Sequence, residues 1–377
     1  MPRSSLELRT LAGQLLTFGF DGTEISTALR TALKTLQPGG VILFTRNIES
    51  PRQTHALLKA VQKESAFPLF RCVDMEGGTV DRLKDVIGPA PSVQEVAQAA
   101  HKPYYREHGR LIGVEVHALG FNVNFAPVLD LRQKVSLGVM ASRTASNDAE
   151  ATAAYAKPFL RGLKDAGVVG CGKHFPGLGE ATLDSHKALP VVHKSWKALW
   201  DEDLLPYRLL SKQLPFIMVA HCAFPEVTGD TVPASISKKW ITDVLRKKIG
   251  YSGLVVSDDL EMGGILKVAS IEEAAVETVQ AGADIYLVCH SEELVHRAWE
   301  AILKEAERSS RFRTKLETAA KRILTAKRRW PALTAKMPPT PSEATVNHLH
   351  QKIWEFSEEI RLTMNPDAAA AMAQEAT

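Results

Sequence analysis

Short apolar runs recur along the chain, and each is followed by a longer stretch with the spacing of an amphipathic helix. Within the runs the apolar residues are continuous rather than alternating, which is typical of strands buried on both faces of a parallel sheet. Eight such runs separated by helical patterns predict an α/β protein built as a closed (β/α)8 TIM-like barrel. The runs cover residues 14–20, 40–44, 67–73, 121–129, 167–174, 216–224, 253–257 and 283–289.

Polar side chains follow nearly every run. In a barrel the carboxyl ends of the strands meet at one mouth, where active sites are built, so the pattern favours the barrel over an open doubly wound sheet. Some of these residues are equally typical of helix caps, loop anchors or packing at the rim. The residues are Asp21, Arg46, Asp74, Asp130, Lys173, His221, Asp258 and His290.

The barrel pattern ends near Trp330, so we expect a single catalytic domain over residues 1–330. Residues 331–341 contain four prolines and are interpreted as a linker. Residues 342–364 have the pattern of a capped amphipathic helix, which we expect to dock on the barrel as a C-terminal helical extension. We expect the end of the 342–377 segment, from Asp367, to be frayed.

Composition excludes several classes of partner. The 46 basic and 43 acidic residues give a net charge of only +3, and no basic block stands out. We therefore expect no nucleic-acid partner. No apolar run approaches the length of a membrane span, so we expect no membrane partner either. We expect a monomer that acts on a small molecule.

The N-terminus and the cysteines indicate the compartment. Residues 1–19 contain no continuous apolar run, so we expect no secretory leader and a cytoplasmic protein. All four cysteines lie in or beside strand-like runs, which predicts buried free thiols. No Cys-x-x-Cys or His-x-x-x-His spacing occurs, so we expect no metal and no cofactor. The cysteines are Cys72, Cys171, Cys222 and Cys289.

The segment from Lys173 to His186 reads Lys-His-Phe-Pro-Gly-Leu-Gly-Glu-Ala-Thr-Leu-Asp-Ser-His. Lys173 and His174 end a buried-looking run, and two glycines then free the backbone. Asp184 lies two residues before His186, and a carboxylate that close to an imidazole can orient it and raise its pKa. The pattern fits a general acid on a loop, although a lone His on such a loop is more often part of a surface turn.

A second chemical pattern ends the seventh run, where Asp258 and Asp259 follow Ser257. Hydrolysis of a glycoside with retention needs one carboxylate to attack the anomeric carbon and an acid to protonate the leaving oxygen. From the residues alone, either carboxylate fits the nucleophile equally well. Asp259 is also placed to cap the next helix.

These segments resemble glycoside hydrolase family 3, and in particular its β-N-acetylhexosaminidase branch. The usual form there is Lys-His-Phe-Pro-Gly-His-Gly, four residues, then Asp-Ser-His; here Leu178 replaces the second His. Asp74 to Arg82 resembles Asp-x-Glu-Gly-Gly-x-Val-x-Arg, and the strand end at 257–262 resembles Ser-Asp-Asp-Leu-x-Met. The resemblance covers about residues 13–330.

The resemblance implies roles for particular residues. Asp258 matches the family's nucleophile, His186 its acid/base, and Asp184 the carboxylate that tunes this imidazole. Glu180, on the same loop, is the next candidate for the acid. The sugar-binding positions implied by the resemblance are Asp74, Arg82, Arg143, Lys173 and His174, with Arg82 donating to the sugar or bracing Asp74. We interpret Glu76, within the same motif, as a salt-bridge partner.

The resemblance implies retaining hydrolysis of terminal non-reducing β-linked N-acetylglucosamine from cell-wall muropeptide fragments. Three alternatives stay open: a family 3 β-glucosidase or β-xylosidase, a phosphorolytic enzyme acting on β-N-acetylglucosaminides, and a non-catalytic sugar-binding barrel. Substrate-assisted hydrolysis by Asp201 and Glu202 is a further alternative. Those two residues lie in a polar helical stretch and are more typical of solvated surface.

Overall fold

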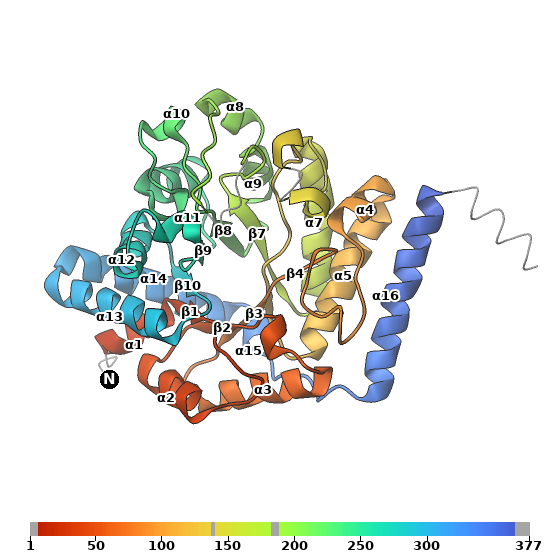
Figure 1. Ribbon diagram of the computed structural model, residues 1–377, viewed down its shortest axis with the longest axis horizontal. Helices are drawn as coiled ribbons and strands as arrows, with labels where there is room; N and C mark the ends of the chain where they lie inside the picture. The colour runs from red at the N-terminus through yellow and green to blue at the C-terminus, as the bar shows by residue number, and fades with distance from the viewer. Residues whose placement is uncertain (1–6, 137–139, 182–187, 366–377) are drawn as a thin grey trace, which may run out of the picture.

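The protein is described from a computed structural model, which covers residues 7–136, 140–181 and 188–365. Eight parallel strands close into a barrel in the order β1-β10-β9-β8-β7-β6-β3-β2 (Figure 1). The predicted (β/α)8 barrel is therefore confirmed. The strands are β1 (Leu16–Phe18), β2 (Gly40–Ile42), β3 (Phe70–Val73), β6 (Val123–Asn124), β7 (Val169–Phe175), β8 (Phe216–Val219), β9 (Leu254–Asp259) and β10 (Ile285–Val288).

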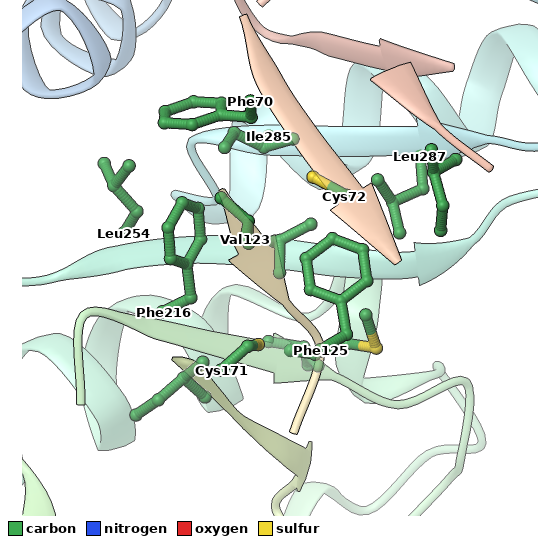
Figure 2. Close-up of a cluster of buried hydrophobic side chains, with 14 of the residues drawn as sticks. Phe70, Cys72, Val123, Phe125, Cys171, Phe216, Leu254, Ile285 and Leu287 are labelled. Atoms are coloured by element: carbon green, nitrogen blue, oxygen red, sulfur yellow. The ribbon is translucent and has the colours of Figure 1, made fainter. Parts of the chain in front are cut away.

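The barrel interior is filled by apolar side chains from facing strands. Phe70 of β3 and Phe216 of β8 meet edge to face across it, with ring centroids 5.3 Å apart. Figure 2 shows this cluster, in which both rings lie among side chains from β6, β7, β9 and β10. Two of the cluster's members are Cys72 and Cys171, and all four cysteines are buried and free, as predicted. Burial on both faces explains why the strands are continuously apolar in sequence.

Helices surround the barrel, and serines cap many of them through the backbone N–H three residues on. Those of the first half are α1 (Leu8–Gln14), α2 (Thr27–Leu36), α3 (Pro51–Glu64), α4 (Val93–Gln98), α5 (Lys102–Ala118) and α7 (Ala149–Asp165). Those of the second half are α8 (Trp196–Asp201), α9 (Leu205–Leu210), α10 (Pro225–Thr228), the π-helical η5 (Lys239–Lys248), α11 (Gly263–Leu266), α12 (Ile271–Ala281), α13 (Glu292–Arg308) and α14 (Ser310–Arg329).

The C-terminal segment lies against the barrel. Residues 331–341 are not wholly irregular, because α15 (Pro331–Thr334) occupies the start of this segment. The helix expected from residue 342 is α16 (Glu343–Met364), which lies beside α4 and α5 (Figure 1). Phe356 of α16 packs edge to face on Tyr104 with ring centroids 5.4 Å apart, and His350 hydrogen-bonds the carbonyl of Ile87 over 2.7 Å.

A lysine is buried at the amino-terminal end of the barrel. Lys327 of α14 is 3% exposed, its Nζ donates to Oε1 of Gln14 over 3.0 Å, and it lies 4.8 Å from the centre of the Phe70 ring. Trp330 then packs on Phe216, with ring centroids 5.5 Å apart. Burial lowers the pKa of Lys327 to about 7.

This burial predicts a pH-dependent stability. The unfolded chain keeps the lysine proton up to its ordinary pKa of 10.5, whereas the folded chain loses it near pH 7. The contribution of Lys327 to the free energy of unfolding should therefore rise from about pH 7 to about pH 10, by about 1 kcal/mol per pH unit. Lys327→Met should remove this rise. Urea unfolding of both proteins at pH 7.5 and 9.0 checks it, and equal pH slopes would contradict it.

Candidate active site

A buried ion cluster occupies one side of the barrel mouth. Glu76 lies in β4 (Met75–Gly77), which pairs with β5 (Val80–Asp81) in a hairpin after β3, and its side chain is fully buried. Arg143 binds it with two nitrogens, Nε at 2.8 Å and Nη2 at 2.9 Å from the carboxylate oxygens. Nζ of Lys173, at the end of β7, lies 2.6 Å from Glu76 and 2.8 Å from Asp74. Lys173, at the end of β7, thus bridges two carboxylates that follow β3.

The surroundings favour the charged forms of Glu76 and Lys173. Burial opposes the charge of Glu76, but Arg143 and Lys173 outweigh it and hold the pKa of Glu76 well below its usual range. Burial likewise acts to lower the pKa of Lys173, yet the carboxylates of Asp74 and Glu76 raise it. The interpretation of Glu76 as a salt-bridge partner agrees with this geometry. Two cations and two anions therefore hold each other at the mouth.

A glycine follows Glu76 and gives the backbone the turn that this position requires. Gly77 has φ of 86°, in the left-handed region that favours glycine. A β-carbon at Gly77 would also lie 2.1 Å from the carbonyl oxygen of Pro91. A side chain at this position would move the hairpin, so the glycine allows the turn that carries Glu76 to the mouth.

A third carboxylate, Asp130, anchors His174 and the loop after β7. Oδ2 of Asp130 accepts hydrogen bonds from Nδ1 of His174 at 2.7 Å and from its backbone N–H at 3.1 Å. Oδ1 of Asp130 accepts from the backbone N–H of Leu178 at 2.7 Å. Asp130 is therefore a loop anchor. Leu178 is 6% exposed and belongs to the hydrophobic core, so the residue that replaces the family's His is an apolar contact here.

Asp258, half-buried at the end of β9, is an ionised carboxylate. Its Oδ1 accepts from the backbone N–H of Asp259 over 2.9 Å. Burial acts to raise the pKa of Asp258, but His174, His221, this hydrogen bond and Lys173 together lower it. Asp258 at the end of β9 and Lys173 at the end of β7 lie at the same mouth, because the carboxyl ends of all the barrel strands meet there.

Asp259 has a different environment. Its Oδ1 accepts from the backbone N–H groups of Glu261 and Cys289, at 3.1 and 3.2 Å. Burial, with Glu261 and Asp258 as neighbouring anions, raises the pKa of Asp259 to about 7. The sequence does not distinguish the two carboxylates, but their surroundings lower the pKa of Asp258 and raise that of Asp259. This difference favours Asp258 as the nucleophile. Asp259 stabilises the turn before α11 rather than capping that helix, which begins at Gly263 with Met262 as its N-cap.

Arg82 lies at the rim of the mouth and does not brace Asp74. Its guanidinium lies 5.6 Å from the centre of the Phe44 ring, on which Arg46 also lies at 4.8 Å. In the described part of the chain its buried Nε has no hydrogen-bond partner, and no hydrogen bond joins Arg82 to Asp74. A donor without a partner at this place is suited to a ligand oxygen.

Asp184 and His186 lie outside the described residues. The segments on either side are joined by Lys194, whose side chain is 7% exposed. Its Nζ lies 2.6 Å from Asp203, 2.6 Å from Glu202 and 3.5 Å from Glu180. This cluster leaves no signal in the sequence, because its carboxylates come from distant positions and form no motif.

The alternative carboxylate pair belongs to the surface. Asp201 pairs with Lys197 at 2.6 Å and Glu202 with Lys194 at 2.6 Å, and both carboxylate side chains are about half exposed. Within the residues that the structure covers, no group of three or more His, Cys, Asp or Glu side chains is arranged to hold a metal ion. Over the same residues, no helix combines the length and apolarity needed to cross a bilayer.

The chain matches known proteins along most of its length. Residues 7–326 match the model of a family described as the glycosyl hydrolase family 3 N terminal domain. The chain belongs to this family. The predicted membership in family 3 is thereby confirmed, and it extends across the whole barrel and all of the site residues described above.

Two curated relatives in the family carry the name beta-hexosaminidase. The one from Alkalilimnicola ehrlichii is 38% identical over 294 residues, which is 76% of this chain and 83% of the relative. The one from Pseudomonas aeruginosa is 37% identical over 270 residues, which is 71% of this chain and 80% of the relative. These relatives bear the name of the branch that the motifs resemble.

Solved structures of proteins named for activity on N-acetylated sugars share the fold. A β-N-acetylglucosaminidase from Paenibacillus sp. str. FPU-7 superposes with a TM-score of 0.87 at 35% identity, covering 94% of this chain and 69% of that one. A β-N-acetylhexosaminidase from Beutenbergia cavernae gives a TM-score of 0.77 at 27% identity, covering 86% of this chain and 99% of that one. The fold is thus shared with enzymes that act on N-acetylated sugars.

The ion cluster predicts a large cost for removing its central charge. Glu76→Gln leaves Arg143 and Lys173 buried with one carboxylate fewer, and should lower the free energy of unfolding by about 3–5 kcal/mol. Glu272→Gln is the matched control, because Arg297 binds Glu272 with two nitrogens on the surface. That change should cost less than about 1 kcal/mol. Urea unfolding at pH 7 measures both, and equal costs would contradict the importance of burial.

Proposed function

We propose that this chain hydrolyses terminal non-reducing β-linked N-acetylglucosamine with retention of configuration, through a covalent glycosyl–Asp258 intermediate. The observation that carries the proposal is the ionised Asp258 carboxylate at the same mouth as the Asp74–Lys173–Glu76–Arg143 cluster. The beta-hexosaminidase relatives and the Paenibacillus β-N-acetylglucosaminidase support the choice of sugar.

The first step of the proposed reaction forms the intermediate. A carboxylate oxygen of Asp258 attacks the anomeric carbon while the bond from that carbon to the leaving oxygen breaks. His186, as an imidazolium, gives its proton to the leaving oxygen, and Asp184 favours this protonated form. The low pKa of Asp258 suits it to this role, because a nucleophile must be ionised to attack.

The second step releases the sugar. The neutral imidazole of His186 now accepts a proton from water, and the water oxygen attacks the anomeric carbon as its bond to Asp258 breaks. The products are the free sugar with its original configuration and the enzyme with His186 protonated again. A histidine fits both steps, because its ordinary pKa lies near neutral pH.

Sugar binding is assigned to the groups around Asp258. Asp74 accepts hydrogen bonds from sugar hydroxyls, Lys173 donates to them, and Nε2 of His174 makes a further hydrogen bond to the sugar. Arg143 and Arg82 supply further donors, and the bond of Arg82 would satisfy its buried Nε. Because Glu76 and Asp130 fix Arg143, Lys173 and His174 before a ligand arrives, little side-chain entropy is lost on binding.

The proposed physiological substrates are cell-wall muropeptide fragments, and the proposed location is the cytoplasm. In this setting the enzyme would remove N-acetylglucosamine from soluble fragments as a monomer. The aglycone of such fragments is a muramic acid derivative that carries carboxylates.

An assay of chromophore release tests the function. The purified chain should cleave aryl β-N-acetylglucosaminide with kcat/KM at least about a hundredfold above aryl β-glucoside, because only the former carries the acetamido group. With phosphate added to the assay, the product should be the free sugar and not a sugar phosphate. Under the same conditions His186→Ala should lose more activity as the leaving group becomes less acidic. Preference for the glucoside, or a sugar phosphate product, would contradict the proposal.

A further inference from the structure

His221, which is not among the predicted sugar ligands, is buried next to the strand that carries Asp258. It follows β8, and β8 pairs with β9 up to Val219 and Ser257. The side chain of His221 is fully buried, and each of its ring nitrogens lies at hydrogen-bond distance from a polar group. A buried imidazole with both nitrogens bonded has one favoured orientation, because any other leaves a polar atom without a partner.

The two partners of His221 come from different segments. Nε2 lies 2.8 Å from the backbone carbonyl oxygen of Asp259, and a carbonyl oxygen only accepts, so Nε2 carries a proton. Nδ1 lies 2.7 Å from Oγ of Ser235, in the short helical turn η4 (Ala234–Ile236). Ser235 is itself fully buried, and its backbone N–H donates to the carbonyl of Ala220 over 3.2 Å. The segment after β8 thus holds the imidazole against the end of β9.

Asp259 in turn orients the carboxylate of Asp258. The backbone N–H of Asp259 donates to Oδ1 of Asp258 over 2.9 Å. The side chain of Asp259 is fixed by the backbone N–H groups of Glu261 and Cys289. Among the described residues no group is hydrogen-bonded to Oδ2 of Asp258, so this is the oxygen left for attack on the anomeric carbon. Asp259 therefore has one backbone bond to the nucleophile, through its N–H, and one to His221, through its carbonyl.

We infer that His221 is a positioning residue for the nucleophile, acting through Asp259, and that Ser235 holds its ring for this purpose. The inference rests on the proposed function and names the groups that set the direction of the attacking oxygen. Because the carbonyl and the carboxylate of Asp259 are both held, its N–H keeps one direction, and Oδ1 of Asp258 is held with it. A displacement of about 1 Å at a reacting atom costs about a hundredfold in rate, so a small movement of this residue is sufficient to matter.

The test compares two substitutions at His221 with one at a matched histidine. His221→Leu removes the donor and keeps a side chain of similar size. His221→Gln returns an N–H the same number of bonds from the backbone as Nε2. The control is His55→Leu. His55 is also buried, with Nε2 2.8 Å from the carbonyl oxygen of Pro338 and Nδ1 3.2 Å from Oγ1 of Thr340, but it lies on α3 outside the barrel.

The values of kcat and KM on aryl β-N-acetylglucosaminide are measured for each variant that thermal melting shows to be folded. His221→Leu should lower kcat about ten- to hundredfold and leave KM within about threefold of the wild type, because the sugar ligands stay in place. The value of kcat falls whichever step limits it, since Asp258 is partly bonded to the anomeric carbon in both transition states. His221→Gln should recover most of kcat, and His55→Leu should keep the wild-type value.

Three results would overturn the inference. One is a wild-type kcat in folded His221→Leu, another is a loss in His221→Gln as large as in His221→Leu, and the third is an equal loss in His55→Leu. Ser235→Ala extends the test to a milder change, which also serves if His221→Leu does not fold. It should lower kcat about two- to tenfold with KM unchanged, because the ring is then held at one nitrogen only. A wild-type kcat in Ser235→Ala would also count against the inference.

Failure of the proposed function gives a different result. A wild-type chain that does not cleave aryl β-N-acetylglucosaminide would contradict the hydrolase itself, and the role of His221 would fall with it. A wild-type chain that cleaves this substrate, with the same kcat in His221→Leu, would keep the proposed function and lose only the role of His221.

Discussion

The bidentate pairing of Arg143 with Glu76, shared with Lys173, is the interaction on which the candidate site depends. A fully buried carboxylate is stable only if cations and hydrogen bonds compensate its lost hydration. Here the compensation comes from two separate parts of the chain, the segment after β6 and the end of β7. These parts must meet at the β4–β5 hairpin for the charge to be buried. The barrel mouth therefore has one arrangement of donors, fixed before any ligand binds.

Neighbouring charges and hydrogen bonds also give the two carboxylates of β9 different pKa values. Asp258 is close enough to the positive charges of the mouth for its pKa to fall, whereas Asp259 is turned toward backbone N–H groups and neighbouring carboxylates and its pKa rises to about 7. Adjacent residues on a strand point in opposite directions, so a difference of one position places them in different environments. A pair of titrating groups separated in this way is typical of a catalytic site.

The sequence was sufficient for the barrel, because strands buried on both faces leave continuous apolar runs. Each of the eight runs overlaps a barrel strand, although β7 and β9 extend one and two residues beyond their runs. Asp258 and Lys173 could be named as candidates because a motif marks each of them, and both lie at the carboxyl ends of barrel strands, but their roles stay predictions. The anchoring of His174 by Asp130 and the cluster around Lys194 depend on contacts between distant segments, which leave no periodic or local signal. The motif that marks Arg82 gives its position along the chain and not the direction of its long side chain, which lies over Phe44 and not against Asp74.

Covalent trapping tests the central claim, that the mouth built around Glu76 presents Asp258 to the anomeric carbon. The protein is incubated with a 5-fluoro N-acetylglucosaminyl fluoride, which slows release of the glycosyl-enzyme, and the labelled peptide is sequenced by mass spectrometry. The wild-type chain should carry one sugar, attached to Asp258, and the Asp258→Ala chain should not be labelled. A label on Asp259, or turnover with inversion and no labelled peptide, would contradict it.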